Sequence, residues 1–417
     1  GSWKATSAFR DPAHHPPLRA PGDGARRRDA ALTMPRPTFT DEHEMLRRTV
    51  RAFVEKEVVP HVDAWEETGG IPRAFWRRLG ELGLLGLEFP TEYGGGGGDF
   101  LSSVVLGEEM ARCRSGGVAF SVLVHTDMSS PWLTRFGTEA QKQAYLPGIV
   151  SGETVCALGI TEPGTGSDMA GIATRAVRDG DRYRLTGTKI FITNGVHGDL
   201  YFVAARTHAG TAERRHAGIS MFLVERGWPG FTVSRRLDKM GMRASDTAEL
   251  SLQECPVPAA NLLGEEGRGF HQLAAGLQRE RIMAAVLALS GAGQALEDTT
   301  AYLRERHAFD GPLAGKQVLR HRVADMATEI EAARHLVHHA AALYTAGEDC
   351  VTAVSMAKLF ATEVANRVAY QAVQLHGGYG YMREFPVERF FRDVRLWTIA
   401  SGTSEIMREI IAKRILS

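Results

Sequence analysis

The spacing of hydrophobic residues changes twice along the chain. From residue 38 onward apolar residues recur at helical spacing, beginning with Leu46, Val50, Phe53 and Val54. The same period continues over residues 73–85, 100–112, 120–135 and 139–150. It then shortens to two in β-branched and aromatic runs at 154–161, 172–178, 183–188, 200–206, 219–225 and 248–253. Long helical patterns return over 269–305, 315–346, 349–374 and 403–415.

This order predicts an α+β fold: helices, then a compact all-β segment, then helices again. A dinucleotide-binding βαβ fold is disfavoured, because strands and helices do not alternate and no G-x-G-x-x-G motif occurs. We expect an N-terminal α-helical domain at 35–153, a middle β domain at 154–267 and a C-terminal helical bundle at 268–417. Residues 1–34 have no hydrophobic period, so we expect a disordered leader or an expression-derived extension. A transit peptide is less favoured, because the stretch lacks an amphipathic apolar face.

Composition narrows the functional classes. The 417 residues carry 49 Lys and Arg against 49 Asp and Glu, and this balance argues against a nucleic-acid partner. No apolar run reaches the roughly 18–20 residues that span a bilayer, so we expect no stable membrane insertion. Four well-separated cysteines without a C-x-x-C pair fit a reduced compartment. We expect a cytoplasmic protein of bacterial type, with the mitochondrial matrix less favoured.

A pair of histidines and a run of charged residues are not expected to form functional sites. His335 and His339 lie one helical turn apart but have no third ligand at motif spacing, so no metal site is expected. The charged run at residues 41–48 is expected to be a solvated helix face.

Two segments carry candidate ligand-binding chemistry. Residues 160–168, Ile-Thr-Glu-Pro-Gly-Thr-Gly-Ser-Asp, follow a predicted strand and combine glycines with hydroxyl groups, so backbone N–H groups can approach a planar or anionic ligand. A tight connection between strands explains this segment equally well. In residues 187–195, Gly-Thr-Lys-Ile-Phe-Ile-Thr-Asn-Gly, Phe191 could lie against a flat ring while Thr193 bonds its edge. As a bare strand, the same segment could belong to the core.

In this order and spacing, the two segments resemble the T-E-P-x-x-G-S-D and K-x-[FW]-I-T-N-G motifs of the acyl-CoA dehydrogenase family. Further matches to family motifs are Pro-Thr-Glu-Tyr-Gly-Gly at 90–95, Arg-His-Ala-Phe at 306–309 with Gln317, Gln-Leu-His-Gly-Gly-Tyr-Gly at 374–380, and Arg-Asp at 392–393 followed by Gly-Thr-Ser-Glu-Ile at 402–406. The resemblance extends over about residues 38–415. It implies a helical N-terminal domain, a β-barrel-like middle domain, a C-terminal four-helix bundle, an FAD cofactor and a homotetramer or dimer of dimers.

The resemblance also assigns the cofactor contacts. The flavin ring is expected to meet Leu158, Ile160, Thr161, Phe191, Ile192 and Thr193. Further contacts, mostly to the diphosphate and adenine, are expected from Gly166, Ser167, Gln374, Leu375, Gly377, Gly378, Thr403 and Glu405. Arg306, Phe309 and Gln317 are expected to reach the FAD of a neighbouring subunit. A guanidinium such as that of Arg306 forms charge-assisted hydrogen bonds with a pyrophosphate.

The catalytic base departs from the commoner family pattern. Most members carry it just before the G-T-S motif, where this chain has Ser401, which cannot act as a general base. A branch resembling long-chain and isovaleryl-CoA dehydrogenases carries the base in an E-R pair, here Glu280-Arg281. The three- and four-residue neighbours of Glu280 are Gly276, Leu277, Met283 and Ala284. A carboxylate on such a stripe is costly unless it is used or paired, and burial raises its pKa. A buried salt bridge to a distant Arg is the alternative.

The implied reaction is the α,β-dehydrogenation of an acyl-CoA thioester to the trans-2-enoyl-CoA. Glu280 is expected to take the α-proton while hydride passes to flavin N5, with electrons leaving to an electron-transfer flavoprotein. Substrate contacts are expected from Ser167, Leu277, Arg281, Ser401 and Gly402. A thioester on a carrier protein, an oxidase that uses oxygen and a non-catalytic flavin-binding scaffold remain alternatives, and the length of the acyl chain is open.

Overall fold

The computed structural model describes residues 39–211 and 214–416, so the expectation for residues 1–34 lies outside the described residues. The first segment is helical, with α2 at Asp41–Phe53, α3 at Val62–Thr68, α4 at Arg73–Glu81, α5 at Phe100–Met110, α6 at Gly116–Leu123, α7 at Pro131–Phe136 and α8 at Glu139–Ser151. Side-chain caps fix several helix starts. At α8, the Thr138 side chain accepts the N–H of Gln141, and the Gln141 side chain accepts the N–H of Thr138.

The helical pattern predicted over residues 120–135 is present but interrupted. Helix α6 ends at Leu123, a wider π-helical turn follows over Val124–Ser129, and α7 begins at Pro131. Pro131 has no N–H to donate to the preceding turn. The hydroxyl of Ser129 donates to the Val124 carbonyl at 2.6 Å, which satisfies one acceptor inside the irregular turn.

The charged run at 41–48 is not a fully solvated face. Arg47 is buried, and its guanidinium donates to Glu109 at 3.1 Å and also contacts Glu108 on α5. Arg51, one turn further, donates to Glu109 at 2.8 Å. Basic residues of α2 therefore face the acidic end of α5, a pairing between distant segments that local charge patterning cannot reveal.

The middle segment forms one eight-stranded sheet. Its strands are β1 at Cys156–Gly159, β2 at Arg175–Asp179, β3 at Arg182–Thr193, β4 at Leu200–Arg206, β5 at Ile219–Glu225, β6 at Phe231–Arg236, β7 at Thr247–Pro258 and β8 at Leu262–Leu263. The order is β6-β7-β3-β2-β4-β5-β8, and β1 pairs in parallel with β4. Strand β3 is longer than predicted, because irregularities in its pairing with β7 interrupt the alternation that marks a strand in a sequence. Strand β6 was not predicted.

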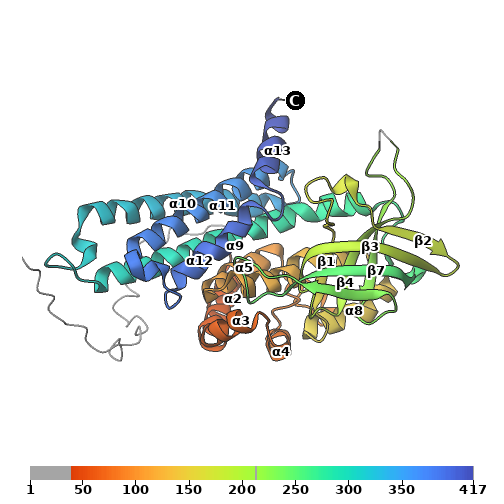
Figure 1. Ribbon diagram of the computed structural model, residues 1–417, viewed down its shortest axis with the longest axis horizontal. Helices are drawn as coiled ribbons and strands as arrows, with labels where there is room; N and C mark the ends of the chain where they lie inside the picture. The colour runs from red at the N-terminus through yellow and green to blue at the C-terminus, as the bar shows by residue number, and fades with distance from the viewer. Residues whose placement is uncertain (1–38, 212–213, 417) are drawn as a thin grey trace, which may run out of the picture. The chain divides into compact units, whose positions relative to one another are not determined.

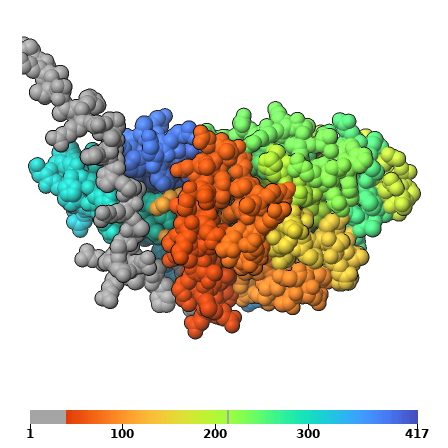
Figure 2. All heavy atoms as spheres, turned by 90° about the horizontal axis from the view of Figure 1, so that it is seen from below, coloured from red at the N-terminus to blue at the C-terminus, as the bar shows by residue number. Residues whose placement is uncertain are grey.

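Both faces of the sheet are covered, which explains the unbroken apolar run of β4. Phe202 packs on one face with Leu146 and Ile149 of α8, and Tyr201 packs on the other face with Phe222 of β5. A strand buried on both faces has no solvent side and loses its polar alternation. In Figure 2 the helices of the first segment, coloured red to orange, adjoin the yellow and green surface of the strands.

The C-terminal segment is again helical. It contains α9 at Gly269–Glu305, α10 at Gln317–Thr345, α11 at Val351–His376, α12 at Pro386–Val394 and α13 at Ser404–Leu416. Helices α9, α10 and α11 lie side by side, with the sheet near the beginning of α9 (Figure 1). The 37 residues of α9 span about 55 Å, so this helix carries side chains into two distant places. The predicted α+β order is confirmed. Within the described residues, no helix has the length and apolarity needed to cross a bilayer.

Candidate active site

The candidate base, Glu280, lies on the inner face of α9. Its residue is 8% exposed, and within the described part of the chain no basic group lies within ion-pair distance of its carboxylate. Burial raises the pKa of Glu280 above the usual glutamate range, although the Ser401 side chain, Arg281 and Lys358 partly oppose this effect. An unpaired buried carboxylate with a raised pKa is a stronger proton acceptor than a surface glutamate.

A buried salt bridge does exist on this part of α9, but it is formed by Arg279 and not by Glu280. Arg279 donates to Asp127 at 2.6 Å, to Glu88 at 2.9 Å and to the Ser103 hydroxyl at 3.1 Å. These partners lie on the first helical segment, so Arg279 ties α9 to it. Consecutive residues on a helix point about 100° apart. Arg279 and Glu280 therefore serve different environments.

Two cations hold the turn that carries Ser401. Ser401 and Gly402 have φ values of +58° and +93°, which lie in the left-handed region. The Arg281 Nε donates to the Ser401 carbonyl at 3.4 Å, and the Lys358 Nζ donates to the Gly402 carbonyl at 2.6 Å. The hydroxyls of Ser401 and Ser404 are buried and have no hydrogen-bond partner of good geometry among the described residues. The turn therefore carries hydroxyl donors, and that of Ser401 lies beside Glu280.

The two motifs of the β segment are locked together by a buried ion pair. The Lys189 Nζ lies 2.7 Å from Glu162 Oε1, and the same carboxylate accepts the N–H groups of Ala173 at 2.7 Å and Thr174 at 2.9 Å. Burial alone would raise the pKa of Glu162, but Lys189 and these N–H groups outweigh it and hold that pKa below its usual range. Burial lowers the pKa of Lys189 to about 8, so the pair is charged at neutral pH. Glu162 thus has a structural role in shaping its loop.

The loop and the strand end beside this pair are open to solvent. An added Cβ at Gly164 or Gly166 would meet no atom within 4 Å, and Ser167 is exposed. Phe191 is 66% exposed with φ of +62°, whereas Ile192 and Thr193 are buried. A bulky residue in the left-handed region costs roughly 1–2 kcal/mol. An aromatic ring held outward in this way is suited to contact a flat ligand.

The other expected cofactor residues occupy a second place. A cavity of about 640 Å³ at the far end of the bundle is lined by Arg306, Gln374, Leu375, Gly377 and Gly378. Phe309 is 84% exposed just beyond α9, and Gln317 begins α10. At 1.5 Å per residue, Glu280 and Arg306 lie about 39 Å apart along α9.

The residues in the Arg306 cavity differ from the group that the sequence predicted. Gln374, Gly377 and Gly378 were expected beside Thr403 and Glu405, but they line the cavity that contains Arg306. Thr403 follows Gly402, which Lys358 contacts, and Lys358 precedes Gln374 by 16 residues of α11, or about 24 Å. Within one chain, Thr403 and Glu405 therefore lie apart from the cluster of expected cofactor residues in the Arg306 cavity.

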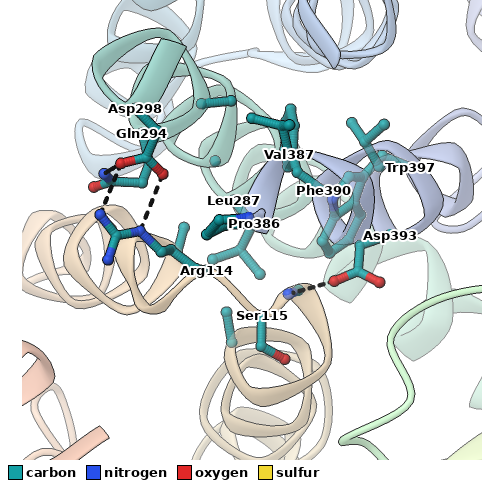
Figure 3. A pocket seen from close by; sticks show the side chains of 16 residues that line it. Arg114, Ser115, Leu287, Gln294, Asp298, Pro386, Val387, Phe390, Asp393 and Trp397 are labelled. Atoms are coloured by element: carbon teal, nitrogen blue, oxygen red, sulfur yellow. Dashed lines mark hydrogen bonds and ion pairs between the residues drawn. The ribbon is translucent and has the colours of Figure 1, made fainter. Parts of the chain in front are cut away.

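A second cavity, shown in Figure 3, contains none of the predicted site residues. Its volume is about 30 Å³, close to the share of one water molecule in the liquid. Its polar edges are already paired: Arg114 bonds Asp298 at 2.7 Å, and Asp393 accepts the N–H of Gly116 at 2.9 Å. Over residues 39–211 and 214–416, no group of three or more His, Cys, Asp or Glu side chains could hold a metal ion.

Comparison with known proteins identifies the family. Sequence models of the acyl-CoA dehydrogenase N-terminal, middle and C-terminal domains match residues 40–153, 157–255 and 267–416. The chain belongs to the acyl-CoA dehydrogenase family. The resemblance stated from sequence motifs is therefore confirmed.

Relatives within the acyl-CoA dehydrogenases match along nearly the whole chain. The mitochondrial long-chain specific acyl-CoA dehydrogenase of Rattus norvegicus is 42% identical over 379 residues, 91% of this chain and 87% of the relative. The crystal structure of an acyl-CoA dehydrogenase from Geobacillus kaustophilus has a TM-score of 0.87 at 46% identity and covers 90% of this chain and 98% of its own. A glutaryl-CoA dehydrogenase from Mycobacterium smegmatis in complex with FADH2 has a TM-score of 0.85 at 31% identity, over 91% and 95% of the two chains.

Sequence reasoning overlooked Lys358, although the signal that found Glu280 is present there too. The positions three and four residues away from Lys358 on α11 are Val354, Ser355, Ala361 and Thr362. A lysine on a stripe of small and apolar residues is costly unless it has a partner.

We predict that Lys189→Met lowers the free energy of unfolding by about 3–5 kcal/mol, because Glu162 is left buried without its cation. Glu162→Gln in the same chain should recover most of this loss. In the wild type, the contribution of Glu162 is complete above the ordinary glutamate pKa and is lost as the pH falls through its lowered pKa. Denaturant titrations at neutral and acid pH measure both effects. A single variant as stable as the wild type would contradict the structural role of the pair.

Proposed function

We propose that this protein is an FAD-dependent acyl-CoA dehydrogenase that converts an acyl-CoA thioester to the trans-2-enoyl-CoA, with Glu280 as the base. The observation that carries the assignment is the buried Glu280 carboxylate, without an ion pair among the described residues, beside the donor-rich turn of Ser401 and Gly402. A scaffold that only binds flavin has no need of such a carboxylate.

The residues present fit FAD on grounds of their own chemistry. The buried hydroxyls of Ser401 and Ser404 lie just before and at the beginning of α13, where a helix N-terminus favours anionic groups. The exposed ring of Phe191 suits a flat ring system, and the Arg306 guanidinium suits a pyrophosphate. When bound, FAD supplies the hydride acceptor. Thr161, Thr193, Thr403 and Glu405 are proposed to add hydrogen bonds to it.

The residues of this chain would perform the proton transfer and hold the thioester. A Glu280 oxygen takes the proton from the carbon next to the thioester carbonyl, and the dry surroundings of this carboxylate favour accepting it. As that proton leaves, negative charge grows on the carbonyl oxygen. The N–H groups of Ser401 and Gly402 donate to no acceptor in the described part of the chain, and we propose that they bind that oxygen.

The separation of the two cofactor clusters supports an assembly of several chains. Glu280 and Arg306 lie about 39 Å apart along α9. A single bound ligand therefore cannot closely contact the residues around both of them. We propose that Arg306, Phe309 and Gln317 complete the cofactor site of a neighbouring subunit in a homotetramer or dimer of dimers. Gln374, Leu375, Gly377 and Gly378, which lie in the Arg306 cavity or border it, belong to the same proposal.

Three further assignments belong to this proposal. Electron transfer to an electron-transfer flavoprotein follows from the family resemblance. A cytoplasmic location is proposed from the bacterial origin of relatives such as the Geobacillus kaustophilus acyl-CoA dehydrogenase. The domain boundaries are proposed at 35–153, 154–267 and 268–417.

We predict that Glu280→Gln keeps the fold and the FAD but slows bleaching of the flavin by acyl-CoA roughly 10²–10⁴-fold, the usual contribution of a general base. Anaerobic stopped-flow absorbance measures the rate. The matched control is Glu297→Gln, on the exposed side of the same helix, which should bleach at the wild-type rate. Ser401→Glu added to Glu280→Gln should restore part of the rate from the other family base position. Bleaching of Glu280→Gln near the wild-type rate would place the base elsewhere.

We predict that Arg306→Ala loses both FAD and the tetramer, because the guanidinium is proposed to bind the diphosphate of a neighbouring chain. Flavin absorbance per chain and light scattering after size-exclusion chromatography measure the two losses. Arg304→Ala, two residues earlier on the exposed end of α9, is the matched control and should retain both. A monomeric Arg306→Ala protein with a full complement of flavin would contradict the shared site.

A further inference from the structure

A completely buried lysine lies beside the proposed base and has no role in the function described so far. Lys358, on α11, has 0% of its surface exposed. Among the described residues its Nζ makes one direct hydrogen bond, at 2.6 Å to the Gly402 carbonyl. Lysine is among the residues that proteins bury least, because an ammonium loses much hydration free energy in a dry interior. Its burial here therefore requires a compensating role.

The contact of Lys358 is made to a strained part of the backbone. Ser401 and Gly402 both have left-handed φ, which is unfavourable for a serine. Neighbouring contacts must hold such a pair in place. Arg281 from α9 holds the first carbonyl and Lys358 from α11 holds the second.

We propose that Lys358 is a positioning residue of the active site, which fixes the Ser401–Gly402 turn and thereby aims its donors at the thioester that Glu280 deprotonates. This inference rests on the proposed function, because it presumes that Glu280 is the base. Lys358 itself touches neither the reacting carbon nor the proton. Its effect passes through the backbone of the turn and through its charge.

The charge of Lys358 acts on the base as well. The groups that influence it are Arg281 and Glu280 from α9, Glu405 from α13, and Glu363 from α11 itself. Burial lowers the pKa of Lys358 to about 8, so it is a cation at neutral pH. That cation and Arg281 both favour the ionised form of Glu280 against the effect of burial.

Loss of the Lys358 charge is expected to change how the bleaching rate depends on pH. Proton abstraction needs ionised Glu280, so the rate rises as the pH passes upward through its pKa. Removing the Lys358 cation raises the pKa of Glu280 further, and the acid side of the rate profile moves to higher pH. A lysine that only filled space would leave that profile in place.

Two variants separate the charge from the hydrogen bond. Lys358→Met removes both, whereas Lys358→Gln removes the charge and keeps a donor for the Gly402 carbonyl. Both side chains are close to lysine in length and remove a buried charge, so we expect both variants to fold and retain FAD. Lys239→Met is the matched control, because Lys239 is a half-buried lysine whose ammonium donates to Ser245, before β7, and to Thr247, at the start of β7.

The experiment uses the FAD-loaded protein and whichever of butyryl-, octanoyl- and palmitoyl-CoA bleaches the wild-type flavin fastest. Anaerobic bleaching rates are measured from pH 5.5 to pH 9, about one to two units on each side of neutrality. This range covers the titration of a glutamate whose pKa is raised above the ordinary value. We expect both Lys358 variants to shift the acid side to higher pH. At the plateau, Lys358→Met should fall by up to roughly 10²-fold from misplacement of the turn, and Lys358→Gln should fall less. Lys239→Met should keep the wild-type profile.

The outcomes distinguish this inference from the proposed function. If Glu280→Gln abolishes bleaching but neither Lys358 variant shifts the profile or lowers the plateau, the positioning role is overturned and the base assignment stands. If Glu280→Gln bleaches normally, the proposed base itself fails. Amide hydrogen exchange over residues 400–403 gives a second readout for a variant of low stability. Unchanged exchange in Lys358→Met would also overturn the positioning role.

Discussion

The structure of the site depends on the cost of keeping charge in a dry interior. Arg279, Glu280 and Arg281 are consecutive, and all three are buried. Arg279 is neutralised by Asp127 and Glu88, and Arg281 bonds a backbone carbonyl. Glu280 has no ion pair among the described residues, and burial raises its pKa. One turn of helix thus keeps two cations occupied while leaving one carboxylate available for chemistry.

The sequence was sufficient for the order of segments and the family, because both depend on local pattern. Helical spacing around Glu280 is enough to mark it as a carboxylate on an apolar stripe. The wrong or missing elements have non-local causes. The turn at Val124–Ser129 depends on Pro131 and on hydroxyls that bond inside the turn, and the length of β3 depends on its irregular pairing with β7.

The site residues show the same limit. The motif containing Glu162 and the motif containing Lys189 could each be found alone, but their ion pair joins residues 27 positions apart and is visible only in three dimensions. The grouping of Gln374 with Arg306 likewise arises because the C-terminal ends of α9 and α11 lie next to each other. No sequence motif contains this information. Arg47 is buried because α5 supplies acidic partners more than 60 residues later.

The length of α9 has a consequence for the genetics of the protein. In the proposed assembly, the base near the beginning of α9 works in one cofactor site, while Arg306 at its end serves another. Subunits damaged at Glu280 and subunits damaged at Arg306 would each be inactive on their own. Co-assembled, they would form some sites that contain both lesions and others that contain neither. Two defective alleles could therefore complement each other within one assembly. The reason is the length of α9, which keeps Glu280 and Arg306 of one subunit in different sites.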